Sequence, residues 1–268
     1  PWLHAPQAIQ ALESGKSVYS AVPVISIPDD EATLDWCDRL VNTCRRTGKR
    51  YMLGETTFYH AEAMYCRRRA AEGAFGHFVY SEGEYFHTFD SHLCDLRKVE
   101  AHRLTGKAGQ EWVSLREQYR ARGLKGGPMH YPTHSVSGPM STMKAHAVKV
   151  CCWGQRPQTD DPFFQRTNLY FSNETALFYM SNGSTMRICE HRHNSIPREG
   201  FRVHGTEGSF EHDVWYQKLT PTPLTKEQMR DPLPPDVFAV FSALGTEEGV
   251  YGGHEGSHAF LVHEFVDA

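Results

Sequence analysis

The hydrophobic pattern of the chain changes its period near residue 75. Before this point, segments with apolar residues at helical spacing alternate with short strand-like segments, as where Ala5 to Leu12 precedes Ser17 to Ala21. Alternating helices and strands are typical of a parallel sheet covered by helices. From Gly76 onward, apolar and polar residues alternate one by one, which is the period of a strand with one exposed face. We therefore predict two domains, residues 1–75 and residues 76–268.

The first region contains signals that begin and end helices. Asp29 or Asp30 can cap a helix that Gly48 ends, and Arg50 to Gly54 follow as a strand. A further helix is predicted from Thr57 to Glu72. The region is therefore expected to have an α/β fold with parallel strands.

The second region is dominated by strand patterns. Strands are predicted for Phe78 to His87, Ala147 to Trp153, Thr167 to Phe171, Thr175 to Met180, Ser184 to Glu190, Gly200 to His204 and Ser209 to Gln217. The dipeptide Asn182-Gly183 favours a hairpin turn, because both residues tolerate positive φ. Residues 219–236 are rich in proline and predict an extended arm, whereas Trp112 to Arg122 and the segment from Phe260 have helical patterns. We expect a large, mostly antiparallel sheet.

The composition excludes several classes of protein. A hydrophobic fraction of 40% is ordinary for a globular chain, and a net charge of −4 gives no electrostatic reason to expect nucleic acid. The apolar runs are too short for a membrane span, so no membrane partner is predicted. Seven cysteines without regular spacing indicate reduced thiols and a cytoplasmic location, although export of a longer parent protein stays open. No His/Cys group has zinc spacing, so no metal site is predicted.

The stretch from Gly126 to Pro139 combines turn residues with groups that can move protons. It contains His130, Tyr131 and His134. We predict that Ser137 caps a helix, which places Tyr131 and His134 on the loop before its N-terminus. The partial positive charge there favours a neutral imidazole and an anionic ligand oxygen. The alternative is a structural turn with a surface histidine.

Several segments in order carry a family resemblance. They are His4 with Ala11 to Val18, then Val22-Pro23, Gly48 to Leu53 and Glu72 to Gly76. Together they resemble the Gfo/Idh/MocA family of nicotinamide-dependent sugar oxidoreductases. The resemblance implies the C-terminal part of a Rossmann domain, followed by an α/β domain whose large open sheet carries the substrate face. It also implies NAD or NADP as the cofactor, a small sugar substrate, and a homo-oligomer formed through the open sheet.

The sequence departs from the family pattern in two places. No Gly-x-Gly-x-x-Gly motif follows a strand, so the half that binds the cofactor phosphates is missing and we expect a fragment of a larger protein, inactive by itself. Most family members have Glu-Lys-Pro where this chain has Ala21-Val22-Pro23. Without that lysine, another residue must take the proton of the substrate hydroxyl.

A second resemblance concerns the reaction. Tyr131 to His134, Met52 to Glu55 and Tyr85 to His87 resemble the branch of NAD-dependent α-N-acetylgalactosaminidase-type glycosidases. In that branch, bound NAD transiently oxidises the sugar at C3, and elimination at C1, water addition and hydride return follow. The resemblance implies His134 as the base for the sugar hydroxyl, Tyr131 and Tyr85 as proton carriers, and Glu55 and His87 as residues that position the ring.

The remaining expected contacts lie on both sides of the reacting centre. His4 resembles the family histidine beside the nicotinamide, and Pro23 and Glu55 are expected on the same cofactor side. His130 is expected, with His87, to bind the substrate. Simpler alternatives stay open, namely a helix cap for His4, a buried hydrogen-bonded acid for Glu55, a core aromatic for Tyr85 and a rim histidine for His87.

Three functions remain open on the sequence. The first is a sugar or polyol oxidoreductase that works by hydride transfer. The second is an NAD-dependent glycosidase with no net redox change. The third is a non-catalytic sheet module for dimerisation or carbohydrate binding.

Overall fold

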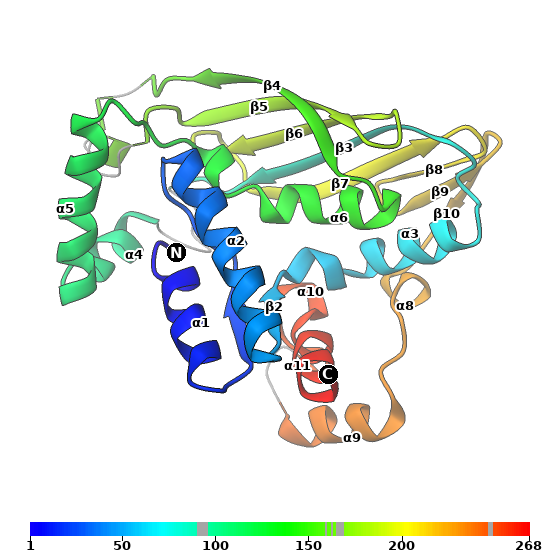
Figure 1. Cartoon of the computed structure of the whole chain (residues 1–268). Helices are drawn as coiled ribbons and strands as arrows, with labels where there is room; N and C mark the ends of the chain where they lie inside the picture. Colours follow the sequence, from blue (N-terminus) through cyan, green and yellow to red (C-terminus); the bar gives the residue numbers. More distant parts are fainter. Residues whose placement is uncertain (90–95, 159, 162, 165–168, 246–248) are drawn as a thin grey trace.

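The structure of the chain is a computed structural model that describes residues 1–268 except 90–95, 159, 162, 165–168 and 246–248. Figure 1 shows a broad sheet with helices gathered on one side of it, and both chain ends lie on that side. The arrangement confirms the predicted α/β fold with a large, mostly antiparallel open sheet.

A small parallel sheet forms the first region. It consists of α1 (His4–Glu13), β1 (Val18–Ala21), α2 (Asp30–Thr47) and β2 (Tyr51–Gly54). Val18 pairs with Tyr51 in parallel register, as predicted. The Asp29 carboxylate accepts a hydrogen bond from the Ala32 amide at 3.0 Å, and Gly48 ends α2 with φ 64°. The alternation of helix and strand, with its caps, therefore forms as the sequence predicted.

The predicted helix from Thr57 to Glu72 is wrong as one element. The chain forms a 3₁₀ turn, η1 (Thr56–Tyr59), and then α3 (Ala61–Ala71), because His60 between them is extended with φ −67° and ψ 147°. The Glu55 carboxylate accepts a hydrogen bond from the Thr57 amide at 2.9 Å and caps η1. The break sets the directions of the Glu55, Thr57 and His60 side chains.

The large sheet has eight strands in the order β10-β9-β8-β7-β3-β6-β5-β4. Their bounds are β3 (Phe78–Phe86), β4 (Ala147–Gln155), β5 (Asn173–Met180), β6 (Thr185–His191), β7 (Arg198–Gly205), β8 (Gly208–Glu211), β9 (Val214–Gln217) and β10 (Thr220–Pro223). The pair β3–β6 is parallel and the other pairs are antiparallel. Asn182 and Gly183 connect β5 to β6, and Gly183 has φ 85°, which confirms the predicted hairpin.

Other predictions for the sheet region need correction. Residues 209–217 form two strands, because His212 and Asp213 adopt positive φ and turn the chain. Residues 219–236 are not an extended arm: they contain β10, α8 (Lys226–Met229) and the start of α9 (Pro235–Leu244). The prolines of β10 fit because it is an edge strand, where a missing N–H leaves no partner unpaired. Of the strand predicted from Thr167 to Phe171, residues 167 and 168 lie outside the described residues, and Leu169 forms an isolated bridge to Gly126.

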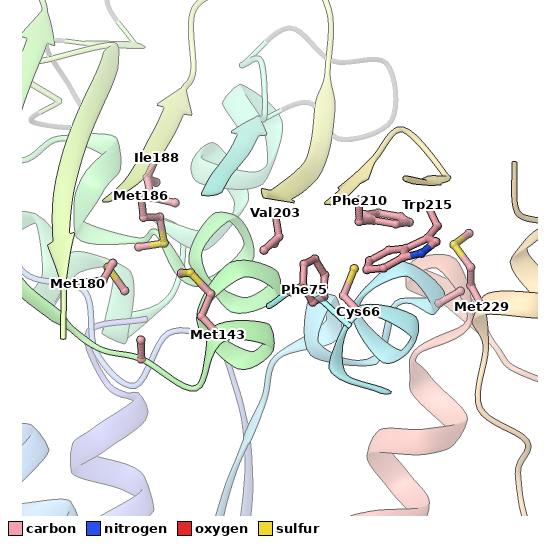
Figure 2. Close-up of a cluster of buried hydrophobic side chains, with 12 residues drawn as sticks. Cys66, Phe75, Met143, Met180, Met186, Ile188, Val203, Phe210, Trp215 and Met229 are labelled. Atoms are coloured by element: carbon pink, nitrogen blue, oxygen red, sulfur yellow. The ribbon is translucent and has the colours of Figure 1, made fainter. Parts of the chain in front are cut away.

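Helices and apolar side chains cover one face of the sheet. The remaining elements are α4 (Leu96–Arg103), α5 (Lys107–Ala121), η2 (Pro128–His130), α6 (Thr133–Met143), α10 (Gly253–Gly256) and α11 (His258–Asp267). α5 confirms the helix predicted around Trp112, and α11 the one predicted from Phe260. Figure 2 shows the buried cluster beneath the sheet, in which Met143 of α6 and Phe75 meet Met186 and Val203.

Two glycines allow the close approach of α6 to the sheet. A Cβ added at Gly83 of β3 would lie 1.8 Å from the Ser135 carbonyl oxygen, and one added at Gly138 would lie 2.4 Å from the Phe201 ring. Only glycine leaves room at both places. The N-terminal half of α6 is therefore pressed against β3 and β7.

The end of the chain returns to the first region. Phe260 of α11 stacks on Tyr59 of η1 with ring centroids 6.3 Å apart, and the Tyr59 hydroxyl donates to Glu264 at 2.5 Å. Within the described ranges, no helix has the length and apolar character needed to cross a membrane.

Candidate functional site

A chain of hydrogen bonds joins Glu55, His134 and Tyr131. The Nδ1 atom of His134 donates to the Glu55 Oε1 atom at 2.9 Å, and the Tyr131 hydroxyl lies 3.1 Å from Nε2 of His134. Glu55 and His134 are each 8% exposed, so the bond between them is shielded from water. A carboxylate that holds one imidazole nitrogen leaves the other free to exchange a proton. The sequence-predicted residues Glu55, Tyr131 and His134 thus form one unit.

The local backbone differs from the prediction at His134. α6 begins at Thr133, so His134 lies in its first turn, and Ser137 does not cap the helix. The sequence suggested Pro139 as a first-turn proline, whereas it lies inside α6. Pro139 has no N–H to donate to the Ser135 carbonyl, and that carbonyl instead points at the space that Gly83 leaves open. Pro139 therefore leaves the Ser135 carbonyl without a helical partner, and Gly83 provides the space that this carbonyl occupies.

The electrostatic environment of His134 also differs from the prediction. Burial lowers its pKa, but the hydrogen bond and charge of Glu55, with the charges of Glu199 and Glu190, together raise the pKa above its ordinary value. Burial raises the pKa of Glu55, and the hydrogen bonds from His134 and Thr57 outweigh it and lower the pKa. The predicted effect of the helix N-terminus is thus overridden by a direct carboxylate partner.

Tyr85 and His87 lie beside this unit at the end of β3. The Tyr85 ring centroid is 4.8 Å from that of His134 and 5.6 Å from that of His87. Burial raises the pKa of Tyr85, and burial lowers the pKa of His87, so both are neutral near pH 7. The Nδ1 atom of His87 is buried and has no hydrogen-bond partner among the described residues. The structure therefore adds two neutral groups that can carry or hold a proton beside His134.

Sequence reasoning missed Thr57 and Glu199. The Thr57 hydroxyl donates to Glu199 Oε1 at 2.6 Å and lies 3.4 Å from Nδ1 of His134. Glu199 is opposite Tyr85 in the β3–β7 register, and its side chain is 27% exposed. Strand pairing between residues far apart in sequence creates this contact, so no local pattern could have predicted it. Glu199 is the more accessible of the two carboxylates next to Thr57.

A second buried network supports the first. Glu190 is fully buried, accepts hydrogen bonds from Ser135 and from Arg192, and burial raises its pKa to about 7. The Arg192 guanidinium lies over the Tyr85 ring at 5.2 Å. Through Ser135 and Arg192, this network contacts the first turn of α6 and the Tyr85 ring. The pattern Glu-His-Arg on a strand gave no sign of it in the sequence.

Three predicted residues lie elsewhere. The Nδ1 atom of His4 donates to the Pro23 carbonyl at 2.8 Å, so these two expected cofactor contacts lie together. His130 accepts a hydrogen bond from the Gly127 amide at 3.1 Å and lines a cavity of about 90 Å³ with Trp112 and Arg116. Within the described residues, no hydrogen bond or ring contact joins His130 to His134. The imidazole of His130 closes its own turn, and substrate binding by it stays a prediction.

Residues of the cluster line two cavities. One, of about 880 Å³ and mostly apolar, extends along β2, α6 and α11 and reaches Glu55 and Thr133. The other, of about 260 Å³, is strongly polar and contains Thr57 and Glu199. The larger cavity has few groups for recognising hydroxyls, so the polar side of the cluster suits a hydroxylated substrate better.

Comparisons with known proteins identify relatives of the chain. A glycosyl hydrolase family 109 protein of Shewanella putrefaciens is 30% identical over 289 residues, which are 99% of this chain and 58% of the relative. A family 109 protein of Shewanella sp. (strain ANA-3) is 25% identical over the same shares of both chains. The chain thus spans less than two thirds of the length of these relatives. No protein-family model matches the sequence.

Solved structures of low identity share the fold. The aldose-aldose oxidoreductase of Caulobacter crescentus, complexed with glycerol, has a TM-score of 0.60 at 18% identity over 99% of this chain and 73% of its own. The chain belongs to glycosyl hydrolase family 109, and its fold is that of Gfo/Idh/MocA-type oxidoreductases. An inositol dehydrogenase homolog of Azotobacter vinelandii, complexed with NAD+, has a TM-score of 0.56 at 17% identity over 80% of this chain and 49% of its own. In this family 109 chain, the sheet covered by α6 corresponds to the large sheet that the sequence resemblance implied.

Proposed function

We propose that this chain supplies the substrate-side residues of an NAD(P)-dependent enzyme that acts on a carbohydrate or polyol. The observation that carries the proposal is the Glu55–His134–Tyr131 hydrogen-bonded unit, which can take a proton from a hydroxyl. The similarity to family 109 glycosyl hydrolases and to sugar and polyol oxidoreductases supports this substrate class.

The proton steps follow from the positions of the side chains. A substrate hydroxyl that approaches Tyr131 passes its proton to Nε2 of His134, directly or through the Tyr131 hydroxyl. Glu55 stabilises the imidazolium that forms, because its carboxylate accepts the Nδ1–H bond. This unit performs the task of the lysine that Val22 replaces. Glu199 and His87 are placed to hold further hydroxyls of the substrate.

The cofactor is proposed on residues of the first region. Burial lowers the pKa of His4 and so favours its neutral form. A neutral imidazole does not repel the positively charged ring of an oxidised nicotinamide. His4, Pro23 and Glu55 would therefore face the nicotinamide, and NAD or NADP would supply hydride acceptance when bound. The sequence contains no Gly-rich turn for the pyrophosphate, so these residues fit only the nicotinamide half.

Two reactions use this site differently. The first is hydride transfer from a sugar or polyol carbinol, in which one base suffices. The second is the glycosidase route. The Tyr85 and Tyr131 rings, which both contact His134, favour it, because elimination needs further proton carriers at C2 and at the leaving oxygen. A dehydrogenase forms NADH in proportion to product, whereas the glycosidase releases aglycone with no net NADH.

The experiment that tests the proposal measures both products on the whole protein. Polyols, free sugars and p-nitrophenyl glycosides are supplied with NAD or NADP, and NADH and p-nitrophenol are followed together. Turnover of either kind that is lost in His134→Ala and kept in His146→Ala, a change at an exposed histidine after α6, supports the site. Absence of turnover with every substrate, or equal turnover in both variants, contradicts it and favours a non-catalytic sheet module.

We also propose that the uncovered sheet face joins two copies of the chain. Trp153, Leu177 and Tyr179 lie on that face and are 67%, 46% and 49% exposed. Figure 1 shows the helices on the opposite side of the sheet, which agrees with the high exposure of these three side chains. Sedimentation should show a dimer that Trp153→Glu dissociates, and a wild-type monomer would contradict this assembly. We also propose a domain boundary near residue 75 and a cytoplasmic location.

A further inference from the structure

His60 is a buried histidine whose imidazole makes no hydrogen bond to the described residues. It is 6% exposed, and its Nε2 atom has no partner among the described residues. Its Nδ1 atom lies 3.9 Å from Glu199 Oε1 and 4.0 Å from Glu255 Oε2, beyond hydrogen-bond reach. A buried imidazole nitrogen without a partner costs free energy, so the position needs an explanation.

Carboxylates gather around this imidazole. Ligand atoms of His60, Glu62 and Glu255 all lie within 4.8 Å of one another. The Oε2 atom of Glu62 is buried and unpaired within the described part of the chain. The three residues come from the start of α3 and from α10, which are distant in sequence but meet here. This distance in sequence explains why residue spacing predicted no metal site.

The positive charge at the cluster is small. The Lys226 ammonium pairs with Glu62 and lies 3.8 Å from Glu255 and 3.9 Å from Asp213. Arg198 and Arg202 line the same cavity but are paired with other carboxylates, among them Glu84 and Glu211. One ammonium therefore serves three carboxylates, and the carboxylate of Glu199 beside His60 adds further negative charge.

The cluster opens into the polar cavity of about 260 Å³. That volume holds a cation with several water molecules, at roughly 30 Å³ for each water. Lys226 is 42% exposed on a long side chain, so its ammonium can leave Glu62 for solvent. An entry path for a cation therefore exists.

We propose that His60, Glu62 and Glu255 bind a divalent transition-metal cation such as Mn²⁺ or Zn²⁺, which displaces the ammonium of Lys226. One imidazole nitrogen and two carboxylates are a ligand set typical of such ions, and water fills the remaining positions. The site is distinct from the proton-transfer unit, which contains His134, but Glu199 and Thr57 connect the two. Its test does not depend on the proposed enzyme activity.

The experiment titrates the EDTA-treated protein with MnCl₂ and, separately, ZnCl₂ in a calorimeter. We expect binding that His60→Ala weakens by at least roughly tenfold, since even indirect partners of metal ligands contribute that much. Glu255→Gln should act in the same direction, and its half-exposed position makes misfolding a weaker explanation. His212→Ala is the matched control, because His212 lines the same cavity but is exposed.

Lys226→Met tests whether the cluster binds a metal ion or holds only the Lys226 ammonium. If the lysine competes with a metal, this variant binds Mn²⁺ or Zn²⁺ more tightly than the wild type. No binding by the wild type, or binding equal in wild type, His60→Ala and Glu255→Gln, overturns the proposal. Binding by Lys226→Met alone also overturns it, because the ammonium would then be the resident cation. Circular dichroism of each variant establishes that the fold is intact.

Discussion

Glu55 and His134 are 79 residues apart in sequence, yet the Nδ1 and Oε1 atoms of the two side chains lie 2.9 Å apart. Glu55 directly follows β2 in the first region, and His134 lies in the first turn of α6, which packs against the large sheet. The contact therefore crosses the proposed domain boundary. Because the pair is buried, its geometry depends on how the two regions pack, and it reports on that packing as well as on chemistry.

Glu55→Gln should lower the pKa of His134. The carboxylate of Glu55 provides the largest contributions that raise this pKa, so burial should dominate once it is neutralised. Glu199→Gln removes a smaller contribution of the same sign and should lower the pKa less. Titration of the His134 ring signals by NMR measures both. Equal shifts in the two variants would mean that the direct hydrogen bond does not control the imidazole.

Gly83→Ala should destabilise the fold by about 1–3 kcal/mol, the usual range for overpacking. The added Cβ would lie 1.8 Å from the Ser135 carbonyl oxygen, so α6 must move away from β3. Gly200→Ala is the matched control, because Gly200 is also a strand residue but has open space around its Cβ position. Urea denaturation measures both. Equal losses would show that strand propensity, and not the approach of α6, determines the effect.

The sequence predicted the elements whose signals are local. The Asp29 cap, the Gly48 stop and the Asn182-Gly183 turn each depend on residues within one turn of chain, and each forms as expected. The start of α6 was wrong because Pro139 follows the rule for a first-turn proline, while the decisive contact of Ser135 with Gly83 is distant in sequence.

The sequence predicted only those residues of the site that belong to a local pattern. Tyr131 and His134 carry a local pattern, but Glu199 and Glu190 reach the site through strand register, which sequence alone does not give. The pKa of His134 depends on these acids, so its direction could not be predicted from the helix terminus.

Glu190→Gln should change the pH dependence of stability. Burial raises the pKa of Glu190 to about 7, so the folded chain holds this proton more tightly than the unfolded chain does. Its stabilising contribution is complete below the ordinary carboxyl pKa, near 4.5, and is lost as the pH rises through about 7. Glutamine stays neutral throughout. The free energy of unfolding of wild type relative to Glu190→Gln should therefore fall between pH 5 and pH 8, at roughly 1.4 kcal/mol per pH unit at most. Thermal or urea unfolding across this range measures it, and parallel curves would contradict the assignment.

The 268-residue chain by itself should bind NAD weakly or not at all. Much of the contact with a dinucleotide comes from a Gly-rich turn and a helix N-terminus at the pyrophosphate, and the sequence has no such motif. The His4 and Pro23 region offers contacts only to the nicotinamide side. Isothermal titration calorimetry tests this, with nicotinamide mononucleotide and adenosine diphosphate as separate probes of the two halves. A micromolar dissociation constant for NAD would mean that the phosphates are held by another part of the chain.

His134→Ala should reduce turnover in the whole protein by roughly 10²-fold or more, the usual scale for a positioned acid–base group. Its imidazole is the member of the unit that contacts both Glu55 and Tyr131, so its loss breaks the proton path in the middle. NAD affinity should change little, because the proposed contacts to the nicotinamide come from His4, Pro23 and Glu55. Tyr131→Phe should lose less if the tyrosine only orients the substrate, since Nε2 of His134 can still reach a hydroxyl directly. His146→Ala is the control, because His146 follows α6 in the chain and its side chain is exposed. If His134→Ala kept near-normal turnover on every glycoside and polyol while His87→Ala or Glu55→Gln abolished it, the proton chemistry would belong to the strand ends, and His134 would only connect α6 to Glu55.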